Sequence, residues 1–194
     1  NGMISNCCIM PLYPLMLAIF GGGEEAQLFI GMVAGVCSVV LIWALARCMF
    51  ESETIGLVAA GMMAVFPMAI FYSVIGLTES LFVVFVLAAF LALYKNKLVL
   101  TSIFFTLSIL ARPTIDIFAP FVIFWHALVI RRAGFFLAFR DLIIYGVIYA
   151  ILMSPWWYHN LNKYGHFVRL SYGFGIVLYA GNNSMNESGG AIAG

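Results

Sequence analysis

The amino-acid sequence predicts an all-α polytopic membrane protein with about six transmembrane helices, an N-terminal interfacial (juxtamembrane) helix and an external C-terminal loop. Of the 194 residues, 64% are hydrophobic and only 9% are charged, whereas a soluble domain carries about 25% charged residues. The mean hydropathy is +1.08. A soluble core cannot bury this much apolar surface, so lipid surrounds most of the chain, and helices satisfy the backbone there.

The first predicted element is the interfacial helix at residues 10–20, within the stretch MPLYPLMLAIFGGG. Its apolar part has only about ten residues, which is too short for a span, and prolines and glycines bound it. The alternative is that it forms the end of an upstream span. Because the chain starts at Asn1 and not at Met, we expect it to be part of a longer membrane protein.

Six apolar runs separated by charged residues predict the membrane helices. They cover residues 28–46, 55–77, 79–94, 98–111, 114–130 and 142–157. Pro67 predicts a kink in the second run, because proline has no backbone N–H to donate. Residues 158–194 form the predicted external loop. No repeat or linker divides residues 1–194, so the sequence predicts a single membrane domain.

The distribution of cations predicts the orientation of these helices. The loops at 47–54, 95–97 and 131–141 fall on one side of a six-span arrangement and hold six of the nine lysines and arginines. Because cytoplasmic loops carry an excess of cations, these loops are predicted to be cytoplasmic. Residues 21–27 and 158–194 are then external.

Charge and cysteine content exclude several kinds of site. The net charge is only +1 and no cluster of cations forms a basic face, so nucleic acid is not an expected partner. The four cysteines, two of them adjacent at Cys7 and Cys8, have neither disulfide-framework nor metal-ligand spacing. His159 and His166 lack neighbouring ligands, so no metal site is expected, although a divalent metal as cofactor stays an open alternative.

Glu79 and Arg112 are the charged residues with the strongest claim to function. Glu79 is either a helix-start acid stabilised by the helix dipole or a carboxylate that orients a polar substrate. The run 98–111 rises only about 21 Å as a helix, short of the roughly 30 Å hydrocarbon core. Arg112 should therefore face a polar cavity below the surface, where a guanidinium suits a phosphate. The alternatives are that Arg112 snorkels to the interface or pairs with Asp116.

Several stretches, in this order, resemble the membrane glycosyltransferases of the GT-C superfamily, in particular the protein O-mannosyltransferases and the bacterial lipid A aminoarabinose transferase. They are PLYPLMLAIFG, ALARCMF, FPMAIFYSVIGLTESLF, LSILARPT and SPWWYHN with the following KYGHF and GNN. The resemblance covers nearly all of the chain. Gln27 and His159 depart from it, because both stand where relatives carry arginine.

The resemblance implies a membrane glycosyltransferase that moves a sugar from a polyprenyl-phosphate donor, its lipid-linked co-substrate, to an acceptor protein, lipid or glycan. The reaction would take place on the outer face of a bacterial or archaeal cytoplasmic membrane, and the catalytic aspartate would lie upstream of Asn1. Arg112 would bind the donor phosphate and Glu79 would be a supporting carboxylate. The substrate groove would be lined by Tyr13, Trp156, His159, Asn160, Asn182 and Asn183.

Arg112, Glu79 and the segment at 156–183 are expected to converge on one outward cavity open to the bilayer. Two other functions remain open at this point. One is a transporter or flippase for a lipid-linked substrate, and the other is a non-catalytic subunit of a membrane complex.

Overall fold

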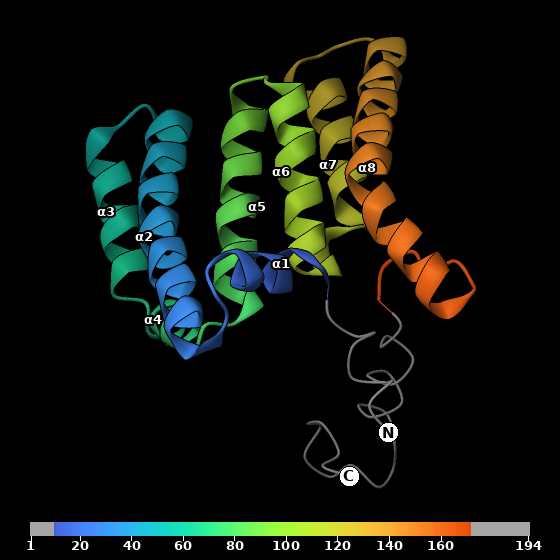
Figure 1. Ribbon diagram of the computed structural model, residues 1–194. Helices are drawn as coiled ribbons and strands as arrows, with labels where there is room; N and C mark the ends of the chain where they lie inside the picture. Colours follow the sequence, from blue (N-terminus) through green and yellow to red (C-terminus); the bar gives the residue numbers. More distant parts are fainter. Residues whose placement is uncertain (1–9, 172–194) are drawn as a thin grey trace, which may run out of the picture.

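A computed structural model describes residues 10–171 of the chain, and this part is built from helices, with no strand in it (Figure 1). The helices are α1 (Leu12–Ile19), α2 (Gly23–Phe50), α3 (Glu53–Ala64), α4 (Pro67–Ile75), α5 (Thr78–Tyr94), α6 (Leu98–Ala111), α7 (Phe118–Trp125) and α8 (Phe135–Tyr164). A 3-10 turn, η2 (Pro113–Ile115), precedes α7, and a π-helical turn, η3 (His126–Ile130), follows it. The all-α prediction is therefore confirmed for the part of the chain described.

Two of these helices, α2 and α8, are long and apolar enough to cross a membrane, and the bent pair α3–α4 makes a third if it is counted as one span. The helices α5, α6 and α7 with η3 are apolar but shorter. Many large apolar side chains point outward, among them Val36, Met62 and Phe136. This surface requires lipid around the helices. A total of six spans stays a prediction.

Both long helices extend beyond the limits predicted from charge. The predicted helix 28–46 is part of α2, which has 28 residues, and the predicted helix 142–157 is part of α8, which has 30. Asp141 does not precede α8 but lies inside it, because Arg131 and Arg140 neutralise its carboxylate. The predicted external loop is also corrected, because its first residues, 158–164, continue α8.

Two other predicted helices are interrupted. Residues 55–77 were predicted as one kinked helix, but α3 ends at Ala64 and α4 begins at Pro67, with a bend of 56° between them. Proline disfavours a helical conformation in the preceding residue, and Phe66 accordingly has an extended backbone. The predicted helix 114–130 likewise starts as the turn η2 and becomes α-helical only at Phe118.

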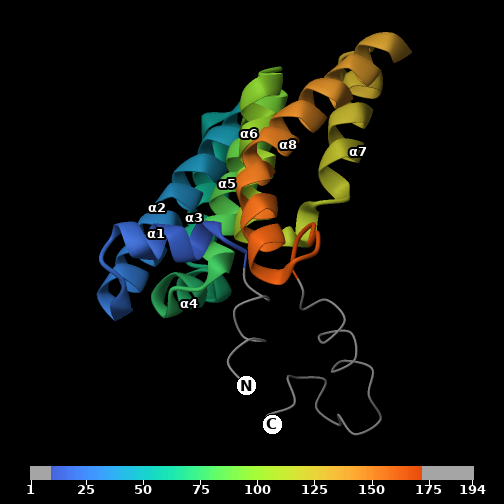
Figure 2. The ribbon, with the colours of Figure 1, turned by 45° about the vertical axis from the view of Figure 1, so that its right-hand side comes forward.

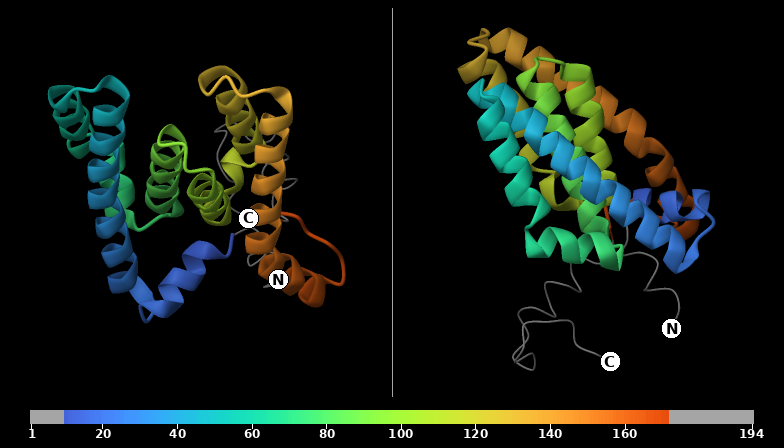
Figure 3. Two further views of the ribbon diagram at one scale, coloured as in Figure 1. Left: turned by 90° about the horizontal axis from the view of Figure 1, so that it is seen from above. Right: turned by 90° about the vertical axis from the view of Figure 1, so that its left-hand side faces the viewer.

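The helices are packed side by side, with α2 against α5, α5 against α6 and α6 against α8. Seen from above, α5 and α6 lie between α2 and α8 (Figure 3). The short helix α1 lies across one end of the bundle, near α4, and contacts both α2 and α6 (Figures 1 and 2). The polar side chains buried in α6 bond to the helix's own carbonyls, as Thr101, Ser102 and Thr106 do. The bundle can therefore bury this helix without unsatisfied hydroxyl groups.

Two glycines bring α2 and α4 into direct contact. A Cβ atom on Gly31 would lie 2.1 Å from the backbone oxygen of Ser73, and one on Gly35 would lie 2.7 Å from the Ser73 hydroxyl. Glycines four residues apart allow close helix packing in membranes. This contact holds α4 beside the start of α5, where Glu79 lies.

Candidate functional site

The ion pair of Arg112 and Glu79 is the centre of the candidate site. Glu79 lies in the first turn of α5, and Arg112 follows the last residue of α6. Because α5 and α6 run antiparallel, these positions meet at one end of the bundle, and the Arg112 Nη1 donates to Glu79 Oε1. Thr78 Oγ1 donates to the other carboxylate oxygen at 3.2 Å. The two residues singled out by sequence are therefore brought together, 33 positions apart.

Arg112 keeps donors available for a ligand. Its side chain is 44% exposed, and its only hydrogen bond to a residue in the range 10–171 is the one to Glu79. A guanidinium has five N–H donors, so it can bind an anion while it remains paired. This geometry suits a phosphate group at the end of α6.

Asp116 does not pair with Arg112, so that alternative is wrong. Its carboxylate is almost fully buried and accepts hydrogen bonds from Arg169 Nη2 at 2.6 Å and from the Tyr149 hydroxyl at 2.8 Å. Burial acts to lower the pKa of Arg169, but Tyr149 and Asp116 raise it by more, so the pKa lies above its ordinary value. No spacing in the sequence indicated this contact, which joins residues 53 positions apart.

The end of α8 holds the segment that follows it. Trp156, Trp157 and Asn160 donate side-chain N–H groups to three consecutive backbone carbonyls, those of Leu170, Arg169 and Val168, at 2.8, 2.9 and 3.3 Å. Asn160 is 1% exposed, and its side-chain oxygen has no partner among the residues described. These residues therefore fix the position of Arg169 over Asp116.

The predicted groove residues Trp156 and His159 form one side of a hollow between α1, α6 and α8. Their rings stack, with centroids 5.6 Å apart and planes 12° apart. The hollow has a volume of about 610 Å³, and its other walls are mostly apolar, from residues such as Leu12 and Leu110. A stacked indole and imidazole beside apolar walls can receive an amphipathic molecule.

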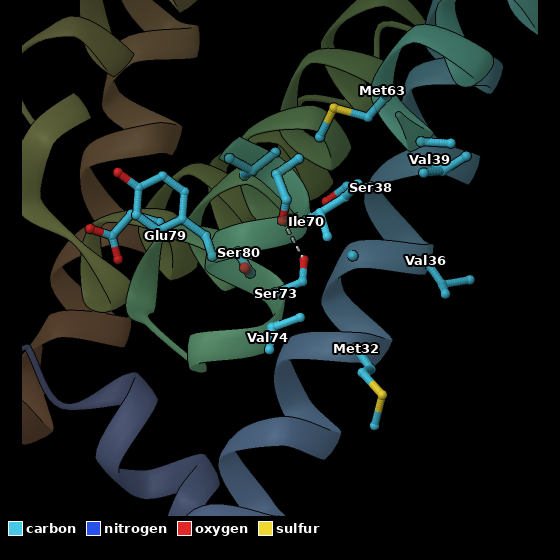
Figure 4. Close-up of a pocket in the computed structure, with 15 residues that line it drawn as sticks. Met32, Val36, Ser38, Val39, Met63, Ile70, Ser73, Val74, Glu79 and Ser80 are labelled. Atoms are coloured by element: carbon cyan, nitrogen blue, oxygen red, sulfur yellow. Dashed lines mark hydrogen bonds between the residues drawn. The ribbon is translucent and has the colours of Figure 1, made fainter. Parts of the chain in front are cut away.

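Glu79 lines a different hollow from Trp156 and His159. The sequence predicted one common cavity for these residues, and that prediction is wrong. The Glu79 cavity of about 430 Å³ lies between α2, the bent pair α3–α4 and α5. Figure 4 shows Glu79 and Ser80 at one side of it and Met32 of α2 at the other. The buried hydroxyl of Ser80 has no hydrogen-bond partner within residues 10–171. Polar groups therefore meet at one end of a mainly apolar cavity.

Tyr13 connects α1 to the turn between α4 and α5. It is buried, and its hydroxyl donates to the backbone oxygen of Gly76, which ends α4 in a left-handed conformation. Burial raises the pKa of Tyr13, so the hydroxyl keeps its proton at neutral pH. Tyr13 thus holds α1 against the turn that precedes Glu79. Asn182 and Asn183 lie outside the residues described.

The described part of the chain holds no group of three His, Cys, Asp or Glu side chains that could bind a metal ion. Among the residues that sequence reasoning missed, only Gly31 and Gly35 carry a sequence signal, the spacing G-x-x-x-G, which is typical of close helix packing. The pairing of Asp116 with Arg169 carries none.

Comparison with known proteins identifies the family. Residues 11–159, more than half of the chain, match the family described as dolichyl-phosphate-mannose-protein mannosyltransferase. No curated protein and no solved structure matches. The family match confirms the resemblance to GT-C glycosyltransferases, and it covers α1, most of α8 and every helix between them. This chain, an integral membrane protein, therefore belongs to the dolichyl-phosphate-mannose-protein mannosyltransferase family of glycosyltransferases.

Proposed function

We propose that the protein transfers a sugar from a polyprenyl-phosphate donor to an acceptor on the external side of the membrane, and that Arg112 binds the donor phosphate. The observation that carries this proposal is the Arg112–Glu79 pair at the end of α6. A half-exposed guanidinium with free donors lies next to a carboxylate that lines a mainly apolar cavity. A polyprenyl-phosphate-linked sugar has an anionic phosphate that matches the guanidinium and an apolar chain that matches the cavity.

The chemistry assigns Arg112 and Glu79 different roles. When the bond between the anomeric carbon and the phosphate oxygen breaks, the leaving group is the lipid phosphate, whose negative charge increases. Arg112 stabilises that charge through hydrogen bonds, which act strongly where water is excluded. Glu79 orients the guanidinium and balances its charge while the donor is absent. The base that removes the acceptor's proton is expected upstream of Asn1, as the resemblance to the family implies.

The test uses the full-length protein and compares Arg112→Lys and Arg112→Ala with the wild type. Lysine supplies one compact charge and not two parallel hydrogen bonds, so Arg112→Lys should bind polyprenyl-phosphate mannose more weakly. Arg112→Ala should lose about 30- to 1000-fold in turnover, as expected for a charged hydrogen bond worth roughly 2–4 kcal/mol in a dry site. Donor binding and sugar transfer are measured in detergent, where transfer distinguishes an enzyme from a flippase.

Arg47→Ala is the matched control. Arg47 also pairs with a glutamate, Glu53, at 2.8 Å, but at the opposite end of the bundle. Its side chain is 54% exposed, so its removal changes charge and surface in a similar way. Wild-type donor affinity and turnover in a folded Arg112→Ala protein would contradict the proposal, as would an equal loss in Arg47→Ala.

A further inference from the structure

The end of the bundle remote from Arg112 carries a cluster of cations. Lys95 and Lys97 lie in the loop between α5 and α6, Arg131 and Arg132 lie in the loop between α7 and α8, and Arg140 lies in the second turn of α8. Both loops are at the same end of the molecule, the top of Figure 1. The two loops lie close together, because Asn96 of one loop and Arg131 of the other line the same small hollow. We call these five residues the cationic rim.

The rim has an uncompensated positive charge. Its neighbouring carboxylate is Asp141, which is 1% exposed and receives Arg131 Nη1 at 2.6 Å and Arg140 Nη2 at 2.9 Å. Lys95, Lys97 and Arg132 are exposed and form no ion pair with any residue between 10 and 171. Five cations therefore share one buried carboxylate, and three of them are free to meet an external anion.

Exposed aromatic side chains lie directly beside the rim. Phe135, Phe136 and Phe139 in the first turns of α8 are 63%, 90% and 52% exposed. As a helix of 30 residues, α8 is about 45 Å long, which exceeds the roughly 30 Å hydrocarbon core. Its first turns can therefore reach the headgroup region, where the rings contact acyl chains while the arginines face headgroups. A nucleic acid or a free anion would leave these rings in water.

We propose that the cationic rim binds the anionic headgroups of phospholipids in the leaflet at this end of the bundle. Asp141 holds Arg131 and Arg140 in fixed orientations, while Lys95, Lys97 and Arg132 supply the attraction. Each cation near a membrane surface strengthens binding to anionic lipid about fivefold. This surface is separate from the Arg112 site, so the inference does not depend on the proposed glycosyl transfer.

The test measures the binding of phosphatidylglycerol to the purified chain in detergent, by native mass spectrometry and by the rise in the thermal unfolding temperature. Phosphatidylcholine with the same acyl chains and inorganic phosphate are the comparison ligands. Arg132→Gln should weaken phosphatidylglycerol binding about fivefold, and Lys95→Gln/Lys97→Gln about 25-fold if their contributions add. The matched control is Lys163→Gln, because Lys163 is exposed near the other end of α8. It should bind as the wild type does.

The wild type provides an independent measurement should a variant fold poorly. Its preference for phosphatidylglycerol over phosphatidylcholine should disappear when the salt concentration rises from 0.1 to about 1 M, since the screening length falls from about 10 to 3 Å. Three results would overturn the proposal: equal binding of the two lipids, an equal loss in Lys163→Gln, or inorganic phosphate stabilising the protein as strongly as phosphatidylglycerol.

Discussion

Gly31 and Gly35 of α2 face the same serine of α4, yet substitution by alanine should affect them differently. A Cβ on Gly31 would lie 2.1 Å from the Ser73 backbone oxygen and 3.0 Å from its carbonyl carbon. These atoms belong to a helix, so α4 must move as a whole to make room. A Cβ on Gly35 would lie 2.7 Å from the Ser73 hydroxyl, which can rotate away, and 3.3 Å from the Ser73 Cβ, which needs a shift of only a few tenths of an ångström.

The magnitudes follow from these contacts. Forcing a methyl group into a packed interface costs about 1–3 kcal/mol or more, and alanine recovers only about 0.5–1 kcal/mol of helix stability. Gly31→Ala should therefore lower the free energy of unfolding by about 2 kcal/mol or more. In Gly35→Ala, rotation of the hydroxyl breaks its 2.7 Å hydrogen bond to the Ala69 oxygen. That loss costs about 1 kcal/mol, which nearly offsets the gain from alanine.

Thermal unfolding in one detergent compares both variants with Gly146→Ala as the control. Gly146 lies inside α8, and no atom lies within 4 Å of a Cβ built there. The expected order of unfolding temperatures is Gly146→Ala at or above wild type, Gly35→Ala near wild type, and Gly31→Ala clearly below. A wild-type unfolding temperature for Gly31→Ala, or equal losses at Gly31 and Gly35, would refute the close packing of α2 on α4.

Two further predictions concern the contacts that hold α1 and the segment after α8. In Asp116→Asn, Arg169 loses its ionic partner, whereas Tyr149 keeps an acceptor, so trypsin should cleave after Arg169 faster than in the wild type. Unchanged cleavage would contradict the inference that Asp116 holds Arg169 in place. Tyr13→Phe removes the hydrogen bond to Gly76 and should lower the free energy of unfolding by about 1–2 kcal/mol, because that buried carbonyl loses its partner. Chemical unfolding measures this loss, and a stability equal to that of the wild type would show that the bond contributes nothing.

Pro67 and Asp141 show which features of the helices a single residue in the sequence can predict and which it cannot. Pro67 correctly indicated a disturbed helix, but it did not indicate the 56° bend or the packing of α4 against Gly31 and Gly35. Asp141 suggested a helix boundary, because an isolated charge in a span is costly. Its two arginine partners remove that cost, and one of them, Arg131, lies ten positions away on the other side of a turn.

The sequence by itself determined the membrane environment, the all-helical class and the family, because hydropathy, helix length and ordered motifs are properties of short segments. It also selected Arg112 and Glu79, since a charge next to an apolar run is conspicuous wherever the chain folds. Only the tertiary structure decided which charges pair. Arg112 meets Glu79 and Asp116 meets Arg169 because antiparallel helices bring distant ends together, and spacing along the chain carries no information about which helices become neighbours.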